Sequence, residues 1–139
     1  MEHAPLAALL CLSKTHAAAV RLLEGSLGGH HGLSFAELRL LRVLAAAPDC
    51  RMRPTDIAAE LEVTASGVTR AVLPLEKRGI VRREPEPGDA RASRVVLTAA
   101  GRTLADDASA TAAEGAARIM RRLSLGQTRQ LERLLGEIL

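Results

Sequence analysis

The chain has 139 residues, the size of one domain or of one domain with helical extensions. Hydrophobic residues make up 47% of it, but with one Phe and no Trp or Tyr it lacks the aromatic platforms on which single-stranded nucleic acid stacks. Its formal net charge of +3 permits a polyanionic partner without requiring one.

Cysteine usage and hydropathy favour a reduced, cytoplasmic protein. Cys11 and Cys50 stand far apart in the sequence and in no metal-ligand spacing. No apolar run approaches the roughly 20 residues that a membrane span needs, and an acidic residue near the N-terminus opposes a secretory signal. Nothing in the chain resembles a catalytic triad, a Cys–His pair or a glycine-rich phosphate loop, so we expect no enzyme and no cofactor.

The N-terminal third has helical periodicity. Leucines and small apolar residues three and four positions apart predict a helix over residues 4–27. The stretch GSLGGHHG, with four glycines, is expected to end that helix in a flexible loop. Ser34 is a suitable N-cap for a second helix, which should stop before Pro48.

Two helices joined by the tripeptide EVT follow. An extended stretch over residues 50–53 leads to Pro54, which fits the first position of a helix because a missing N–H costs nothing there. Thr64 can cap the next helix, which should end at Gly79. The inward faces of this helix-turn-helix are expected to consist of Ile57, Ala58, Leu61 and Val63 on the first helix and Val68, Val72 and Leu75 on the second.

The outer face of the second helix carries Ser66, Gly67, Thr69 and Arg70. Entry into the major groove of duplex DNA requires a backbone that can come close and short polar side chains that reach base edges or phosphates. Small hydroxyl residues and one arginine near a helix N-terminus meet both requirements.

A hairpin, which we call the wing, is predicted after this helix. The runs over residues 80–84 and 93–97 are rich in β-branched residues and flank the turn PEPGDARA, in which the prolines add stiffness and Gly88 allows the reversal. Arg91 and Arg94 supply the charge that a narrow minor groove attracts. Asp89 is expected to aim the Arg91 guanidinium through an ion pair.

Two further helices complete the chain. Thr98 can cap a long Ala-rich helix over residues 99–122, and Ser124 with Gln127 forms a capping box before the last helix, which carries an apolar stripe. The predicted fold class is therefore mainly α with a small β-hairpin wing, that is, a winged helix-turn-helix flanked by helices.

The stretch DIAAELEVTASGVTRAVLPLEKRGIVRREPEPGDARASRVVLTAAGR resembles the winged helix of the MarR family of bacterial transcriptional regulators. The resemblance covers about residues 33–105. Its most specific signs are Thr69, the run Leu75-Glu76-Lys77, Gly79, Val81, Arg83, the wing tip Asp89-x-Arg91 and the motif Leu97-Thr98-x-x-Gly101.

The resemblance implies a DNA-binding region over residues 33–98 and a helical dimerisation region formed by residues 1–32 and 99–139, intertwined as one domain. It also implies a homodimer that binds a pseudo-palindromic operator in double-stranded DNA and acts as a repressor released by a small-molecule effector, whose identity the sequence does not reveal. The DNA contacts are expected from Arg53, Thr55, Ala65, Ser66, Gly67, Thr69, Arg70, Asp89, Arg91 and Arg94.

Three residues depart from the family pattern. Pro74 lies inside the recognition helix, where it removes the hydrogen bond to the carbonyl of Arg70 and is expected to kink the helix. Glu62 occupies a turn position where glycine is usual, and Ala90 replaces the first arginine of the wing tip. Pro74 and Ala90 motivate an alternative hypothesis, a winged-helix module that binds proteins and has lost DNA binding.

Cysteine and histidine leave a second alternative open. Cys11 lies where peroxide-sensing members of the family place a reactive thiol, which would make the protein a redox regulator. Those members surround the thiol with tyrosines, which this chain lacks, so we favour a buried, inert Cys11. His16 is a candidate for the effector crevice and equally for a helix surface. His30 and His31 have no further histidine in the last two helices to complete a site, so we expect no metal.

Overall fold

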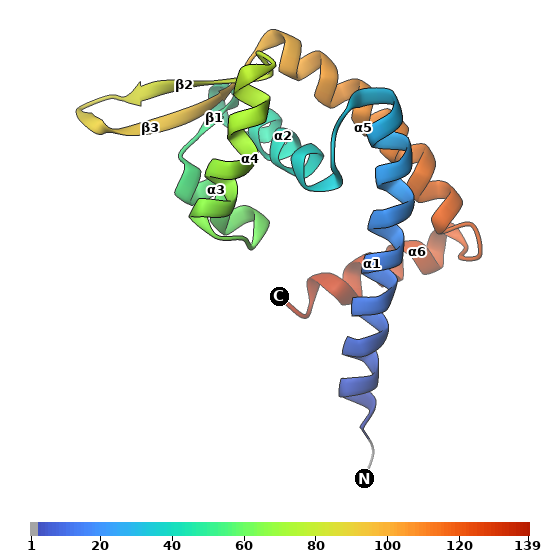
Figure 1. The fold of residues 1–139 in the computed structure, drawn as a ribbon. Coiled ribbons are helices and arrows are strands. Elements are labelled where there is room, and N and C mark those ends of the chain that lie inside the picture. The colour runs from blue at the N-terminus through green and yellow to red at the C-terminus, as the bar shows by residue number, and fades with distance from the viewer. Residues whose placement is uncertain (1–2) are drawn as a thin grey trace.

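The computed structural model describes residues 3–139, which form six α-helices and one small antiparallel sheet (Figure 1). The helices are α1 (Ala4–His31), α2 (Phe35–Ala46), α3 (Pro54–Leu61), α4 (Ala65–Lys77), α5 (Ala99–Ile119) and α6 (Leu125–Gly136); a short 3-10 helix, η1 (Pro48–Cys50), and the strands β1 (Arg51–Met52), β2 (Val81–Glu86) and β3 (Asp89–Leu97) complete the chain. The predicted fold class is confirmed.

The first helix is longer than the sequence predicts. α1 runs through Gly25, Gly28 and Gly29 and ends only at Gly32, whose φ of 63° places it in the left-handed region. Each internal glycine costs a helix about 1 kcal/mol relative to alanine. Burial of Leu23 and Leu27 in the core offsets this cost, so the expectation of a break in the glycine-rich stretch was wrong.

The two adjacent histidines therefore lie on the last turn of α1 and not in a flexible loop. His31 Nε2 lies 2.7 Å from the hydroxyl of Thr111 on α5, and His30 Nδ1 lies 2.9 Å from the carbonyl of Ser26. Arg78 also donates to the carbonyls of His31 and Gly32, each at 3.0 Å, which satisfies the end of α1.

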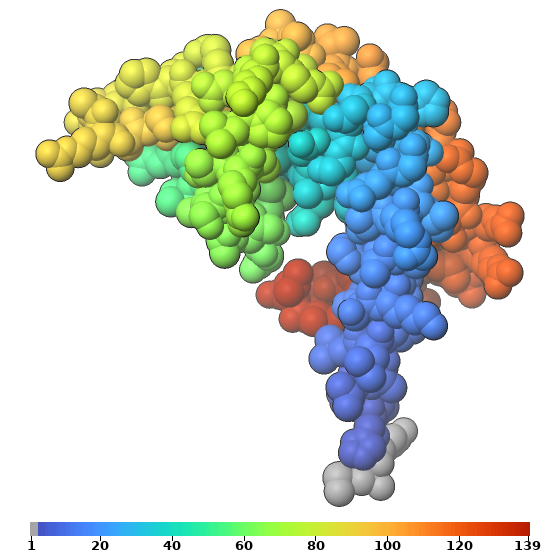
Figure 2. All heavy atoms as spheres, in the orientation of Figure 1, coloured from blue at the N-terminus to red at the C-terminus, as the bar shows by residue number. Residues whose placement is uncertain are grey.

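The N-terminal half of α1 projects from the body of the molecule (Figure 2). By length and composition α1 is apolar enough to cross a membrane, contrary to the expectation from the sequence. Its exposed large apolar side chains are Leu6, Leu9, Leu10, Leu12 and Leu22. Cys11 lies on the same half and is also exposed, so the expected burial of this thiol is wrong for a single chain.

The winged helix has an aliphatic core between α2, α3, α4 and the sheet. The predicted inward residues of α3 and α4 are buried, with one exception: Val63, in the turn between the helices, is 47% exposed. The turn at Glu62 directs Val63 outward, and Leu61 fills the position closer to the core. The buried residues contributed by α2 are Leu38, Leu40, Leu41 and Leu44.

The sheet has the order β1-β3-β2, and the hairpin of β2 and β3 forms the wing. Its register pairs Val81 with Leu97 and Glu84 with Arg94, and a bulge lies between Pro85 and Glu86. Both strands extend further toward the tip than predicted, because β2 is an edge strand and tolerates a proline that cannot donate to the ladder.

The C-terminal helices begin at the predicted caps. Thr98 Oγ1 accepts the Gly101 N–H at 3.0 Å, and Ser124 and Gln127 form the capping box of α6. α5 ends at Ile119, slightly before the predicted end. α5 packs along α1, whereas α6 buries none of its own residues and leaves its apolar stripe exposed.

One carbonyl group joins the winged helix to α5. The Ile80 carbonyl accepts the Thr98 N–H at 3.1 Å and lies 3.0 Å from the Thr98 hydroxyl. A Cβ added to Gly101 would stand 2.1 Å from the Ile80 oxygen and 2.7 Å from a methyl of Leu97. Only glycine therefore allows α5 to approach the Ile80 carbonyl and Leu97 this closely.

We predict that Gly101→Ala lowers the free energy of unfolding by about 1–3 kcal/mol, because the new methyl group overpacks against backbone. Gly29→Ala is the matched control, since a Cβ there meets nothing within 4 Å and the residue is helical. It should stabilise the protein by about 0.5–1 kcal/mol. Urea unfolding measures both; equal effects of the two substitutions would contradict the packing described at Gly101.

Candidate nucleic-acid interface

The helix-turn-helix is fixed by one strained residue and one cap. Glu62 ends α3 with φ 53° and ψ 46°, the left-handed conformation that the turn requires. Thr64 begins α4 by accepting the Gly67 N–H on its hydroxyl at 3.1 Å, as predicted. A Cβ on Gly67 would lie 3.1 Å from that same hydroxyl oxygen, so glycine at this position preserves the cap.

The outer face of α4 presents short polar groups to solvent. Ala65, Ser66, Thr69 and Arg70 are all exposed. The Thr69 hydroxyl donates to the carbonyl of Ala65 at 3.2 Å, and the Ser66 hydroxyl lies 3.2 Å from that of Thr64. Arg70 forms no ion pair with any residue in the described range 3–139, so its guanidinium is available to a partner.

The proline in the recognition helix does not end it. α4 continues past Pro74 to Lys77. Pro74 and Arg70 are both exposed, so water can reach the turn of helix in which the Arg70 carbonyl lacks its usual donor. The inward residues Val68, Val72 and Leu75 remain buried on both sides of this position.

The wing tip is closed by Asp89, although not as the sequence suggested. Asp89 Oδ1 accepts the backbone N–H of Arg91 at 2.9 Å and does not pair with the Arg91 guanidinium. A short carboxylate reaches a backbone N–H two residues on more easily than the end of a long side chain. Gly88, with φ 82°, makes the reversal, and the Arg91 side chain extends freely from the exposed tip.

Two carboxylates in the second half of β2 pair with four arginines, a cluster that we call the wing base. Glu84 pairs with Arg51, with Arg82 at 2.9 Å and with Arg94 at 3.7 Å. Glu86 pairs with Arg53 at 3.0 Å and with Arg94 at 3.4 Å. The two carboxylates therefore lie among four guanidiniums.

The ion pairs shift the pKa values of both acids in one direction. The hydrogen bond from Arg53 holds the pKa of Glu86 below its ordinary value, and the bond from Arg82 does the same to the pKa of Glu84. Conversely, the bond to Glu86 raises the pKa of Arg53. Lowered carboxylate pKa values mean that these pairs stabilise the fold above the ordinary carboxyl pKa and are lost as pH falls through the lowered values. At neutral pH the wing base is fully ion-paired.

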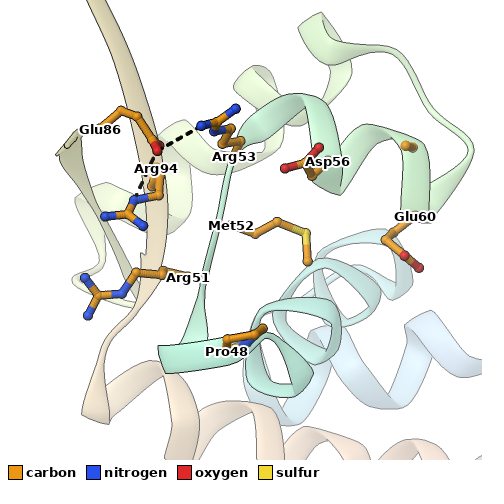
Figure 3. A pocket seen from close by; sticks show the side chains of 9 residues that line it. Pro48, Arg51, Met52, Arg53, Asp56, Glu60, Glu86 and Arg94 are labelled. Atoms are coloured by element: carbon orange, nitrogen blue, oxygen red, sulfur yellow. Dashed lines mark hydrogen bonds and ion pairs between the residues drawn. The ribbon is translucent and has the colours of Figure 1, made fainter. Parts of the chain in front are cut away.

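A hollow of about 560 Å³ opens between the wing base, η1, β1 and α3 (Figure 3). Arg53, Arg94 and Glu86 line one wall of it, and Asp56 and Glu60 of α3 line another. Figure 3 shows the Glu86 carboxylate between the two guanidiniums, with one interaction to each.

The expected DNA-contacting residues therefore fall into three groups. The α4 residues share one exposed face, and Asp89 and Arg91 form the exposed wing tip. Arg53, with Thr55 two residues further along, lies at the start of α3, while Arg94 is half-buried in the wing ion pairs. Sequence reasoning missed Glu84 and Glu86. The signal was present, since Arg82, Glu84 and Glu86 alternate along β2 and share one of its faces.

The other candidate residues lie outside these groups. His16 and Cys11 are both exposed on α1, away from the winged helix. Within residues 3–139 no group of three or more His, Cys, Asp or Glu side chains is placed to hold a metal ion.

A helix-turn-helix with an exposed polar second helix, followed by a hairpin with an exposed arginine, defines the winged helix-turn-helix class of protein. Residues 31–92 match the model of the MarR family. The chain is 31% identical over 107 residues to the HTH-type transcriptional repressor Rv2887 of Mycobacterium tuberculosis, covering 77% of this chain and 76% of that protein. Mb2911 of Mycobacterium bovis gives the same values. The chain belongs to the MarR family.

Solved structures of regulators have the same fold over nearly the whole chain. Sco3205 of Streptomyces coelicolor, a MarR family regulator in complex with DNA, matches with a TM-score of 0.87 and 24% identity, covering 99% of this chain and 87% of that one. The regulator BldR of Sulfolobus solfataricus matches with a TM-score of 0.89 and 22% identity, covering 99% and 97%.

Glu62→Gly should raise the free energy of unfolding by about 0.5–1 kcal/mol. Glycine removes the left-handed strain, which costs about 1–2 kcal/mol. Part of this gain is lost, because glycine loses more backbone entropy on folding than glutamate does. Glu62→Ala is the control, because alanine keeps the strain and should give no gain. Thermal or urea unfolding compares the three proteins, and a gain for alanine equal to that for glycine would contradict the backbone explanation.

Proposed function

We propose that the protein is a dimeric, cytoplasmic transcriptional repressor that binds a specific sequence in double-stranded DNA. Membership of the MarR family supports this, as do the relatives named as repressors and the DNA complexes of Sco3205 and of a mutant of Escherichia coli MarR. The observation that carries the proposal is the exposed face of α4, which the helix-turn-helix presents with its side chains uncommitted to other elements.

α4 would lie in the major groove. Ser66 and Thr69 have short side chains close to the helix backbone, so they suit contacts to phosphates or to base edges near the helix. Arg70 is long enough to reach a guanine edge with two hydrogen bonds, the commonest base-specific contact.

The wing tip would contact the neighbouring minor groove. Arg91 is exposed beyond the ion pairs of the wing base, and its backbone is fixed by Asp89. A narrow minor groove concentrates negative potential, which favours an unpaired guanidinium there.

The dimer would form through α1 and α6. These helices carry most of the exposed large apolar side chains, and no residue of α6 is buried in the single chain. A second copy that covers both helices would remove this apolar surface from water, which also accounts for the apolar composition of α1 without a membrane. In this proposal residues 33–98 bind DNA, and residues 1–32 with 99–139 form the dimerisation region.

An effector would act by population shift. A small molecule that binds between the DNA-binding and dimerisation regions favours one separation of the two recognition helices, and only one separation fits an operator. An effector that favours a separation unable to fit the operator lowers the fraction of operator that is occupied by protein, and so releases repression.

Arg70→Ala should weaken binding to a duplex from the protein's own promoter region by about 1–3 kcal/mol, roughly 5- to 150-fold, and should reduce discrimination at one base position.

Arg91→Ala should weaken binding and lower the slope of log K against log salt by about 1. Arg21→Ala on α1 removes the same charge elsewhere. Fluorescence anisotropy across a salt series measures these effects; slopes that are identical for Arg91→Ala and Arg21→Ala would contradict the wing assignment.

Leu10→Glu should convert the dimer to monomers, since a carboxylate buried without a partner at an apolar interface costs more than the leucine contact contributed. Ala100→Glu is the control, because it adds the same charge on an exposed position in the first turn of α5. Sedimentation equilibrium gives both association constants. A monomeric wild-type protein, or a dimer equally stable with glutamate at position 10, would contradict the proposed interface.

A further inference from the structure

Glu86 forms ion pairs with two arginines but a hydrogen bond with only one of them. Its Oε1 accepts from Arg53 Nη2 at 3.0 Å, while its Oε2 faces Arg94 Nε at 3.4 Å without forming a hydrogen bond. Glu86 Oε2 and Arg94 Nε are both buried, and neither has a hydrogen-bond partner among the described residues. The Glu86 side chain is only 13% exposed, although its partner Arg53 lies largely in solvent.

The same two arginines border the hollow between the wing base and α3. Arg53 is the N-cap residue of α3 and therefore lies at the positive end of that helix. A guanidinium recognises a carboxylate and a phosphate through the same paired N–H groups. The Glu86 carboxylate lies between Arg53 and Arg94 (Figure 3), and a phosphate of a DNA backbone is an acceptor of the same kind for both guanidiniums.

Building on the proposed DNA-binding function, we propose that Glu86 is an internal competitor of the DNA phosphates for Arg53 and Arg94. In the free protein the carboxylate holds both guanidiniums at the wall of the hollow. When DNA binds, one or both guanidiniums exchange Glu86 for a phosphate. Glu86 thereby sets the affinity of the wing base for DNA below the value that its arginines alone would give.

Glu84 does not share this role. It lies one step closer to the core along the same face of β2, is held by Arg51 and Arg82 as well as Arg94, and does not line the hollow. Arg53, by contrast, has no other carboxylate partner within the described residues. Loss of the Glu86 charge therefore frees Arg53 fully and Arg94 partly.

The variant Glu86→Gln keeps the shape of the side chain and removes its charge. It should bind a duplex of the protein's own promoter region roughly three- to tenfold more tightly, and the slope of log K against log salt should steepen by roughly 1, because one more phosphate is neutralised. The matched control is Asp106→Asn, which breaks the exposed pair of Asp106 with Arg102 on α5, outside α1 and α6. Affinity and slope should stay at the wild-type values in that control.

The double variant Arg53→Ala/Glu86→Gln tests whether the gain passes through Arg53. Compared with Arg53→Ala alone, it should show a gain of less than twofold, since the competed arginine is absent. A full gain in the Arg53→Ala background, or identical binding by Glu86→Gln and Asp106→Asn, would overturn the competition. Absence of salt-dependent DNA binding by the wild-type protein would instead contradict the proposed function itself.

Thermal unfolding shows whether Glu86→Gln destabilises the fold. If Glu86→Gln unfolds at a lower temperature than wild type, Glu86→Asp replaces it, because the shorter carboxylate keeps the charge but cannot span both arginines. Glu86→Asp should then bind DNA more tightly than wild type, by less than the tenfold upper limit above. Unchanged affinity of a folded Glu86→Asp would overturn the proposal.

Discussion

The carbonyl group of Ile80 is the point on which the arrangement of the molecule depends. α4 ends at Lys77, and three residues later Ile80 places its carbonyl where Thr98 donates to it and where only a glycine at position 101 leaves room. The end of the recognition helix, the start of β2 and the start of α5 therefore meet at this carbonyl. Because α5 also packs along α1 and α2, this junction is part of the packing that connects α1 with the winged helix.

Few positive charges on the proposed DNA-binding surface are free of ion pairs. The chain has a net charge of only +3, and most arginines of the wing base are already paired with Glu84 and Glu86. Among residues 3–139, Arg70 on the recognition helix and Arg91 at the wing tip form no ion pair. A surface with few free charges relies on shape and on individual contacts, which favours sequence-specific over non-specific binding.

Local signals in the sequence were sufficient for the helix ends and the hairpin. Thr64 and Ser124 cap their helices through side chains within three residues, so no tertiary information was needed. The glycine-rich end of α1 was mispredicted because burial of Leu27 outweighs helix propensity. The alternation along β2 indicates that Glu84 and Glu86 share a face, but it does not identify the partners of Glu86, because Arg53 and Arg94 come near it only when the sheet assembles. The exposure of Cys11 follows from a surface that a single chain leaves uncovered.

The central claim is that two recognition helices are held at a fixed separation by the α1, α5 and α6 layer and read one operator together. Hydroxyl-radical footprinting of the protein on its promoter region tests this most directly. The account predicts two symmetrically related protected segments whose centres lie about 10 base pairs apart, one helical turn, with protection of the flanking minor grooves by the wings. A single protected segment without a symmetric mate, or no protection at protein concentrations that saturate the dimer, would contradict it.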